Sequence, residues 1–174
     1  MSPGYRCSIP AGGCTRRDYE AVREDITIKN ADGVFFLTGK DFTNAGSASS
    51  NLKGILENMG IPPEIIRRAS IAAFEAEMNA IIYAVAGMMH YSVTSEAVKV
   101  ILQDMGPGIP DIDLAMREGY STAPDYIREM GFGSGMGLPN IKKNADKLTI
   151  TSTVGEGTTL EFLIYLEGLS SQTS

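Results

Sequence analysis

The sequence predicts a single α+β domain, because strand-like and helix-like segments alternate along a chain of ordinary composition. The chain has 174 residues, of which 43% are hydrophobic and 21% are charged, and a chain of this kind can bury one hydrophobic core. Strands are indicated by runs that alternate apolar and polar residues, and helices by apolar residues at three- and four-residue spacing. Two glycine-rich segments, residues 104–109 and 131–138, interrupt this pattern and indicate a ligand site.

We expect the domain to occupy residues 23–167, between two tails. Residues 1–22 contain several prolines and glycines and few apolar residues, which indicates a flexible or docking tail. Residues 168–174 are expected to be a polar C-terminal tail. Cys7 and Cys14 are the only cysteines, and three states stay open for them: two reduced thiols, a disulfide bond, or a metal ion shared across a dimer.

Charge and hydropathy restrict the partners that the sequence predicts. The formal net charge of −6 opposes general binding to DNA or RNA, so we expect a protein or a small molecule as the partner. No apolar run approaches the roughly 20 residues that a bilayer span needs, and the N-terminus lacks the apolar core of a secretory signal. We therefore expect a cytoplasmic protein that does not bind a membrane.

The first half of the domain is predicted to contain a hairpin and two helices. Residues 26–29 and 34–37 have the pattern of short strands, and residues 30–33 have the composition of a tight turn between them. A short helix is predicted from Leu52 to Met59. The longest helix begins at Pro63, which suits a first helical turn, and is predicted to reach about residue 86. On that helix Glu75 and Asn79 lie four residues apart on one face, whereas Glu77 points elsewhere.

The second half is predicted to contain four strands and one substantial helix. The strands are expected at residues 88–94, 97–103, 148–153 and 158–166, and the helix at residues 139–147. Residues 111–130 lie between the two glycine-rich segments and include a short helical stretch at 114–117. Their polar, turn-rich composition is typical of a mobile cover over a site, although an ordinary long surface loop is the alternative.

A nucleotide site needs groups that recognise adenine, hold Mg²⁺ and bind phosphates, and the sequence offers candidate residues for each. Asp104 ends a predicted strand and can accept a hydrogen bond from an adenine amino group. Asn79 offers a neutral oxygen to Mg²⁺, which proteins hold with few ligands besides phosphates and water. The loop Gly131–Gly137 and the start of the helix at Pro139 supply N–H donors for phosphates. Glu75 can orient or deprotonate an attacking hydroxyl group or water molecule.

Together these segments resemble the ATPase family shared by histidine kinases, type II topoisomerases, mismatch-repair proteins and heat-shock chaperones. That family has, in order, a helix with Glu-x-x-x-Asn, an Asp-x-Gly-x-Gly segment, a lid, a second glycine box and a Gly-Thr pair near the last strands. The corresponding segments here are Glu75–Asn79, Asp104–Gly108, Gly131–Gly137 and Gly157–Thr158. The resemblance implies a two-layer α/β sandwich of the Bergerat type, with a mixed, mostly antiparallel sheet and helices on one face.

Within that family, the second half is most similar to the bacterial anti-sigma factor and switch-protein serine/threonine kinases. Residues 104–113, 119–122, 134–138 and 155–159 carry this similarity. It implies that the protein binds ATP and Mg²⁺ and phosphorylates a small antagonist or switch protein, with a sigma factor as a further candidate partner. Relatives of this kind commonly form dimers, so a homodimer is one of the expected states.

The resemblance also implies roles for individual residues. Glu75 is expected to be the catalytic base and Asn79 the Mg²⁺ ligand, while Asp104 reads adenine with support from Thr158. The residues expected to bind the nucleotide are Asn79, Asp104, Gly106, Gly108, Ile109, Gly131, Gly133, Ser134, Gly135, Met136, Gly137, Leu138 and Thr158.

One departure from those kinases keeps other functions open. They often carry a basic residue in the lid near the terminal phosphate, whereas this chain has Ala123 and Pro124 there; the substitutes to consider are Arg128, Lys142 and Lys143. The alternatives are therefore an interaction module whose lid closes over ATP, and a slow ATPase. A histidine kinase is not expected, because the only histidine, His90, lies in a predicted strand.

Overall fold

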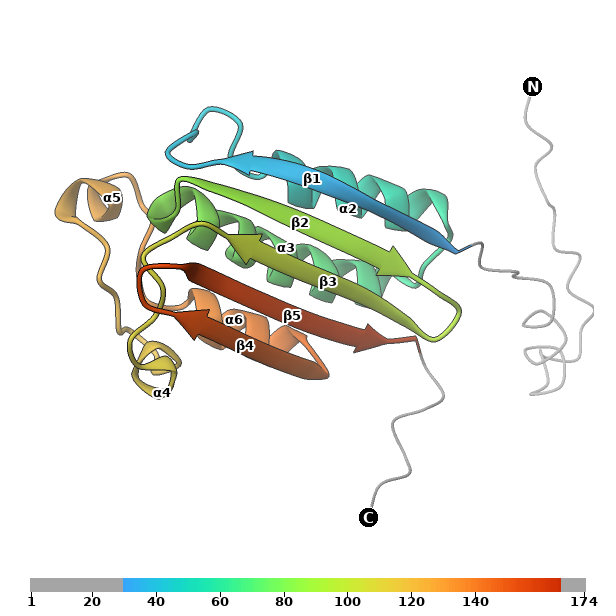
Figure 1. Cartoon of the computed structure of the whole chain (residues 1–174). Helices are drawn as coiled ribbons and strands as arrows, with labels where there is room; N and C mark the ends of the chain where they lie inside the picture. Colours follow the sequence, from blue (N-terminus) through green and yellow to red (C-terminus); the bar gives the residue numbers. More distant parts are fainter. Residues whose placement is uncertain (1–29, 167–174) are drawn as a thin grey trace, which may run out of the picture.

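The computed structural model describes residues 30–166, which form a two-layer arrangement of one sheet and its covering helices. The strands are β1 (Ala31–Thr38), β2 (Ala86–Val93), β3 (Ala97–Asp104), β4 (Lys147–Thr153) and β5 (Gly157–Tyr165). The helices are α2 (Ser47–Asn58), α3 (Pro63–Tyr83), α4 (Ile112–Ala115), α5 (Asp125–Glu129) and α6 (Gly137–Asn144). The five strands lie in the order β1-β2-β3-β5-β4, and all neighbours are antiparallel (Figure 1).

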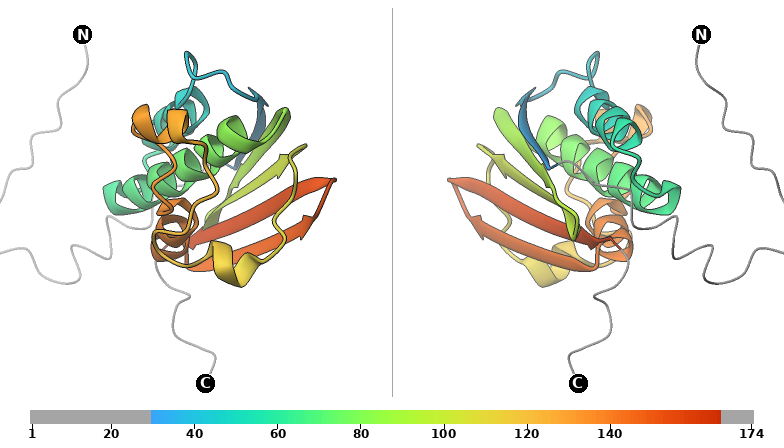
Figure 2. Two further views of the ribbon diagram at one scale, coloured as in Figure 1. Left: turned by 90° about the vertical axis from the view of Figure 1, so that its left-hand side faces the viewer. Right: turned by 90° about the vertical axis from the view of Figure 1, so that its right-hand side faces the viewer.

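Helices α2, α3 and α6 cover one face of the sheet, as the two side views in Figure 2 show. The core lies between these layers. Helix α3 approaches the sheet closely because small side chains form its buried face: Ala69, Ala72, Ala73, Ala76 and Ala80 are each at most 2% exposed. The predicted fold class is confirmed, with the difference that every strand pair of residues 30–166 is antiparallel, where a mixed sheet was predicted. No helix within residues 30–166 is both long and apolar enough to cross a membrane.

A carboxylate from α3 caps the N-terminus of α2. Glu77 is completely buried, and its two oxygens accept hydrogen bonds from the backbone N–H groups of Gly46 (3.1 Å), Ala48 (3.1 Å) and Ser49 (2.9 Å). These N–H groups have no partner within the helix, and the positive end of the helix dipole also favours a negative charge there. The cap explains why α2 begins at Ser47, ahead of the predicted start. It also confirms that Glu77 points away from the predicted site residues of α3.

The predicted hairpin turn at residues 30–33 is wrong, because residues 31–33 are part of β1 and pair with residues 91–93 of β2. Gly33 leaves room for a neighbouring side chain. A Cβ atom on Gly33 would lie 2.6 Å from the hydroxyl oxygen of Tyr91, whose ring stacks on Phe35 with centroids 5.4 Å apart. The predicted first strand at residues 26–29, both tails and the two cysteines lie outside the described residues.

Strand pairing also corrects the ends of two helices. The long helix was predicted to reach residue 86 but ends at Tyr83, since Ala86 pairs with Thr38 in the sheet. The helix predicted at residues 139–147 begins at Gly137 and ends at Asn144, and Lys147 is already the first residue of β4. In both cases the residues at the predicted end of the helix form backbone hydrogen bonds with a neighbouring strand, so the helix ends earlier than its sequence pattern indicates.

Candidate functional site

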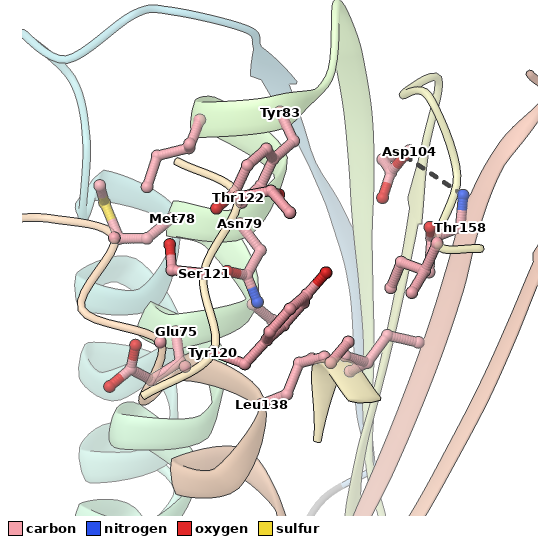
Figure 3. A pocket seen from close by; sticks show the side chains of 18 of the residues that line it. Glu75, Met78, Asn79, Tyr83, Asp104, Tyr120, Ser121, Thr122, Leu138 and Thr158 are labelled. Atoms are coloured by element: carbon pink, nitrogen blue, oxygen red, sulfur yellow. Dashed lines mark hydrogen bonds between the residues drawn. The ribbon is translucent and has the colours of Figure 1, made fainter. Parts of the chain in front are cut away.

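A cavity of about 490 Å³ lies between α3 on one side and the ends of β3 and β5 on the other. Figure 3 shows Glu75 and Asn79 on the α3 wall, opposite Asp104 and Thr158, with the side chain of Tyr120 between the two walls. The predicted site residues that line the cavity are Glu75, Asn79, Asp104, Gly108, Ile109, Gly131, Gly133, Ser134, Gly135, Gly137, Leu138 and Thr158. Gly106 and Met136 do not line it, although both adjoin residues that do.

On the α3 wall, Glu75 and Asn79 are half-buried and differ in their contacts. Glu75 Oε1 accepts a hydrogen bond of 2.6 Å from Nδ2 of Asn140, on α6. Within residues 30–166 the side chain of Asn79 makes no hydrogen bond, so its oxygen is available to a ligand. A Cβ atom on Gly137 would lie 3.2 Å from Asn79 Oδ1 and 3.4 Å from Glu75 Oε2. Both polar groups therefore face the first residue of α6, where the glycine loop ends.

On the opposite wall, Asp104 is held by the backbone. Its Oδ1 atom accepts hydrogen bonds from the N–H groups of Gly106 (2.9 Å) and Thr158 (3.2 Å), and Oδ2 accepts none from residues 30–166. Burial raises the pKa of Asp104, and the two backbone hydrogen bonds oppose this change without cancelling it. One oxygen thus fixes the carboxylate, and the other is available to a hydrogen-bond donor.

Ser152 connects the two strands and the first glycine segment, and sequence reasoning missed it. Its hydroxyl oxygen accepts a hydrogen bond from the N–H group of Ile109 (2.8 Å). The same hydroxyl donates to the carbonyl oxygen of Gly157 (3.0 Å) and lies 2.9 Å from Oγ1 of Thr158. It fixes Thr158 beside Asp104. The only signal in the sequence was the predicted hairpin between β4 and β5, which places Ser152 near Thr158 without singling it out.

The glycine loop, residues 131–137, packs directly on the segment of residues 111–130, which we call the lid. Gly135 has a φ of 77°, and a Cβ atom on it would lie 2.5 Å from the carbonyl carbon of Gly119. The N–H group of Gly119 donates to the carbonyl oxygen of Gly135 at 3.0 Å. Only glycine allows both this backbone conformation and this approach. The contact brings Tyr120 across the cavity (Figure 3).

The connection from residue 111 to residue 130 is anchored by a small hydrophobic cluster of its own. It contains α4 and α5, of which α5 was not predicted from the sequence. Ile127 is completely buried and Ala123 is 4% exposed, and both pack with Met78 and Ile82 of α3. Beside this cluster the rings of Phe42 and Phe132 stack with centroids 6.2 Å apart. The lid therefore lies against α3 through apolar contacts next to the cavity.

The wall of the cavity is acidic. The carboxylates of Glu75, Asp104 and Asp111 line it, and no lysine or arginine of residues 30–166 does. Arg128 lines a neighbouring hollow of about 360 Å³, which shares Ser121 and residues 131–134 with the larger cavity. Its guanidinium group donates to the carbonyl oxygen of Ser121 at 3.2 Å. Of the three basic candidates, only Arg128 lines a hollow that includes residues of the glycine loop; Lys142 and Lys143 are exposed and line neither hollow.

The donor groups fit a magnesium ion that arrives with phosphates better than a metal held by protein alone. Within residues 30–166 no three His, Cys, Asp or Glu side chains are grouped so that they could hold a metal ion. Mg²⁺ is usually bound by one or two protein oxygens together with phosphate oxygens and water. The amide oxygen of Asn79, which has no hydrogen bond within the described residues, matches that pattern.

Comparison with known proteins identifies the family. Residues 64–168 match the family of histidine kinase-, DNA gyrase B-, and HSP90-like ATPases. The chain belongs to this ATPase family. The resemblance to this family that the sequence predicts is thus confirmed.

Two groups of relatives within the ATPase family are similar in sequence. The serine/threonine-protein kinase RsbT of Bacillus subtilis (strain 168) is 30% identical over 118 residues, which are 66% of this chain and 83% of RsbT. The anti-sigma F factor of Priestia megaterium is 38% identical over 93 residues, which are 49% of this chain and 60% of that factor. The resemblance to anti-sigma factor and switch-protein kinases is therefore confirmed.

One solved structure supports the fold. A chain in the crystal structure of the SiaB–SiaC complex from Pseudomonas aeruginosa superposes with a TM-score of 0.54, at 14% sequence identity. The match covers 85% of this chain and 98% of that one. At this identity the likeness concerns the arrangement of the sheet and helices alone.

Proposed function

We propose that this ATPase-family chain is a regulatory serine/threonine protein kinase that uses Mg-ATP to phosphorylate a small antagonist or switch protein. The observation that carries the proposal is the placement of Glu75 and Asn79 on one wall of the cavity, opposite Asp104. The name and the coverage of the RsbT relative support the same activity. The names of the anti-sigma relatives make a sigma factor a second candidate partner.

The nucleotide is proposed to lie across the cavity with its two ends on different elements. The adenine amino group donates to Asp104 Oδ2, with Thr158 beside it. The phosphates lie along residues 131–137, where backbone N–H groups and the start of α6 favour an anion. Asn79 holds Mg²⁺, which neutralises charge on the phosphates and orients them for transfer.

Glu75 supplies the proton acceptor in the proposed reaction. Its carboxylate takes the proton from a serine or threonine hydroxyl group of the partner as the hydroxyl oxygen forms a bond to the terminal phosphorus. The bond from that phosphorus to the bridging oxygen breaks, and its electron pair leaves with ADP. The proton then passes from Glu75 to solvent. Positioning and charge neutralisation are the main contributions that a protein makes to such a transfer.

The test compares the wild-type chain with Glu75→Gln. Each is incubated with Mg-ATP labelled at the terminal phosphate and with separately purified small antagonist-type proteins of the same organism. We expect label on a serine or threonine of one of them, and transfer that falls at least about a hundredfold in Glu75→Gln, as for loss of a general base. ATP binding should persist in the variant. Transfer at the wild-type rate by Glu75→Gln would show that the base is assigned wrongly.

A second candidate function is an ATP-binding interaction module that hydrolyses ATP slowly or not at all. The acidic cavity wall favours it, since no lysine or arginine of residues 30–166 lines the cavity to neutralise the terminal phosphate. Such a module would bind ATP and yield no phosphoprotein, and its affinity for a partner would differ between its ATP-bound and ADP-bound forms.

A homodimer is also proposed, and light scattering with and without nucleotide tests it.

A further inference from the structure

Helices α3 and α6 are joined by polar contacts at both ends of their shared face. Near the start of α3, Arg68 Nε donates to the carbonyl oxygen of Asn144 at 3.0 Å, and its guanidinium group forms an ion pair of 2.6 Å with Asp146. Two helical turns later, Glu75 accepts the 2.6 Å hydrogen bond from Asn140. The two helices are therefore fixed antiparallel to each other, with Asn140 opposite Glu75.

The contact between Asn140 and Glu75 is short and charge-assisted, which makes it stronger than a hydrogen bond between neutral groups. Asn140 is itself held in place: its backbone N–H group donates to the carbonyl oxygen of Met136 at 2.8 Å, and its carbonyl oxygen accepts from Asn144 Nδ2 at 2.9 Å. Asn140 does not line the cavity. Its amide is therefore directed at the carboxylate of Glu75 and not at a ligand.

The bond also decides which oxygen of Glu75 is available. Oε1 is occupied by the Asn140 amide, and Oε2 lies on the side of Gly137 and Asn79. The available oxygen is thus the one next to the proposed magnesium ligand and to the end of the glycine loop. A base in this place can reach a hydroxyl group that attacks a phosphate held by that loop.

We propose that Asn140 is a positioning residue that fixes the Glu75 carboxylate with Oε2 toward the attacking hydroxyl group. The inference rests on the proposed role of Glu75 as the base and adds a residue that the sequence motifs do not contain. Because Asn140 belongs to the helix that follows the glycine loop, the orientation of the base is tied to the element that holds the phosphates. Asn140 donates to the carboxylate and takes no proton itself.

The experiment measures single-turnover loss of the terminal phosphate from Mg-ATP, with a partner hydroxyl as acceptor where one is identified and with water otherwise. The variants are Asn140→Ala, which removes the donor, Asn140→Asp, which replaces it with an acceptor, and Asn140→Gln, which keeps an amide. Lys147→Ala is the control, because Lys147 is exposed at the start of β4 and lines neither hollow. Alanine favours a helix more than asparagine does, so Asn140→Ala should keep α6 intact; thermal unfolding checks this.

We expect Asn140→Ala to slow the transfer step by about tenfold to a hundredfold, the usual effect of losing a hydrogen bond to a charged group. The Mg-ATP concentration that gives half the maximal single-turnover rate should stay within about twofold of the wild type, because Asn140 does not line the cavity. Transfer in Asn140→Asp should be at least as slow as in Asn140→Ala, and transfer in Asn140→Gln should be faster than in Asn140→Ala.

A wild-type rate in Asn140→Ala overturns the inference and leaves the kinase proposal intact. An equal loss of nucleotide affinity in all three variants also overturns it, since the role would then be structural. Absence of transfer from the wild type to every candidate partner protein overturns the kinase proposal itself.

Discussion

Replacement of Asp104 by asparagine tests the proposed recognition of adenine separately from the stability of the fold. In the structure Oδ1 of Asp104 accepts hydrogen bonds from the N–H groups of Gly106 and Thr158. The Oδ1 atom of an asparagine can accept both hydrogen bonds in the same way. The substitution then puts an NH₂ group in the place of Oδ2. That group meets the amino group of adenine donor to donor, and a charge-assisted hydrogen bond is lost. The affinity for ATP should fall by about tenfold to a hundredfold.

The stability of Asp104→Asn should change in the opposite direction. Burial raises the pKa of Asp104, so the folded state binds this proton more tightly than the unfolded chain does. The stability that the group contributes is complete below the unfolded-state pKa and is lost as the pH rises through the folded-state pKa. Asparagine does not titrate. As the pH rises from about 3 to about 7, Asp104 becomes ionised and the wild type loses this contribution, whereas the variant does not. The unfolding temperature of the variant, compared with that of the wild type, should therefore be higher at about pH 7 than at about pH 3.

Calorimetry with ATP, ADP and GTP, together with thermal unfolding at both pH values, checks this prediction. Guanine carries a carbonyl oxygen where adenine carries an amino group, so Asp104→Asn should also improve binding of GTP relative to ATP. Thr159→Ala, on the residue after Thr158, serves as a control that leaves the adenine contact unchanged. Unaltered ATP affinity in Asp104→Asn, or a loss of affinity that only follows a loss of stability, would refute the reasoning.

Three further substitutions test other contacts of the structure. Glu77→Gln should lower the free energy of unfolding in urea by about 1–3 kcal/mol, because its NH₂ group would face N–H groups at the start of α2; an unchanged unfolding midpoint would contradict the cap. Arg128→Ala should weaken binding of Mg-ATP several-fold and leave Mg-ADP unaffected if Arg128 serves the terminal phosphate, and equal losses for both nucleotides would exclude that role. Asn79→Ala should lower ATP affinity only when Mg²⁺ is present, which a titration with and without EDTA measures.

The sequence was sufficient for the parts of the site that have a local pattern. Glu75 and Asn79 are one helical turn apart, and Asp104 ends a strand of period two, so each could be placed on its element before the structure was known. The glycine segments could be recognised because clustered glycines indicate loops with positive φ angles, which Gly108, Gly131 and Gly135 have. The structure brings these separate patterns to one cavity. Their meeting follows from the strand order, in which β5 lies beside β3 and carries Thr158 to Asp104.

The residues that hold the site in place could not be predicted, because their partners are distant in sequence. Asn140 is 65 residues from Glu75, and Ser152 is 43 residues from Ile109. An asparagine inside a helix and a serine inside a strand are ordinary surface residues by any local rule, and only packing of the two elements gives them a role. The same reason explains the wrong turn at residues 30–33, where a polar tetrapeptide with glycine has the local chemistry of a turn.

The acidic wall of the cavity bears on the choice between a kinase and a binding module. A triphosphate beside Glu75, Asp104 and Asp111 needs positive charge from elsewhere, because like charges in a partly buried site repel strongly. A magnesium ion at Asn79, as proposed above, would supply part of it, and Arg128 lines the hollow that includes residues 131–134 of the glycine loop. If Arg128→Ala weakens ATP binding and leaves phosphate transfer per bound ATP unchanged, the arginine serves binding alone. A loss in the transfer step instead would mean that the lid supplies charge during the reaction, as a kinase requires and a binding module does not.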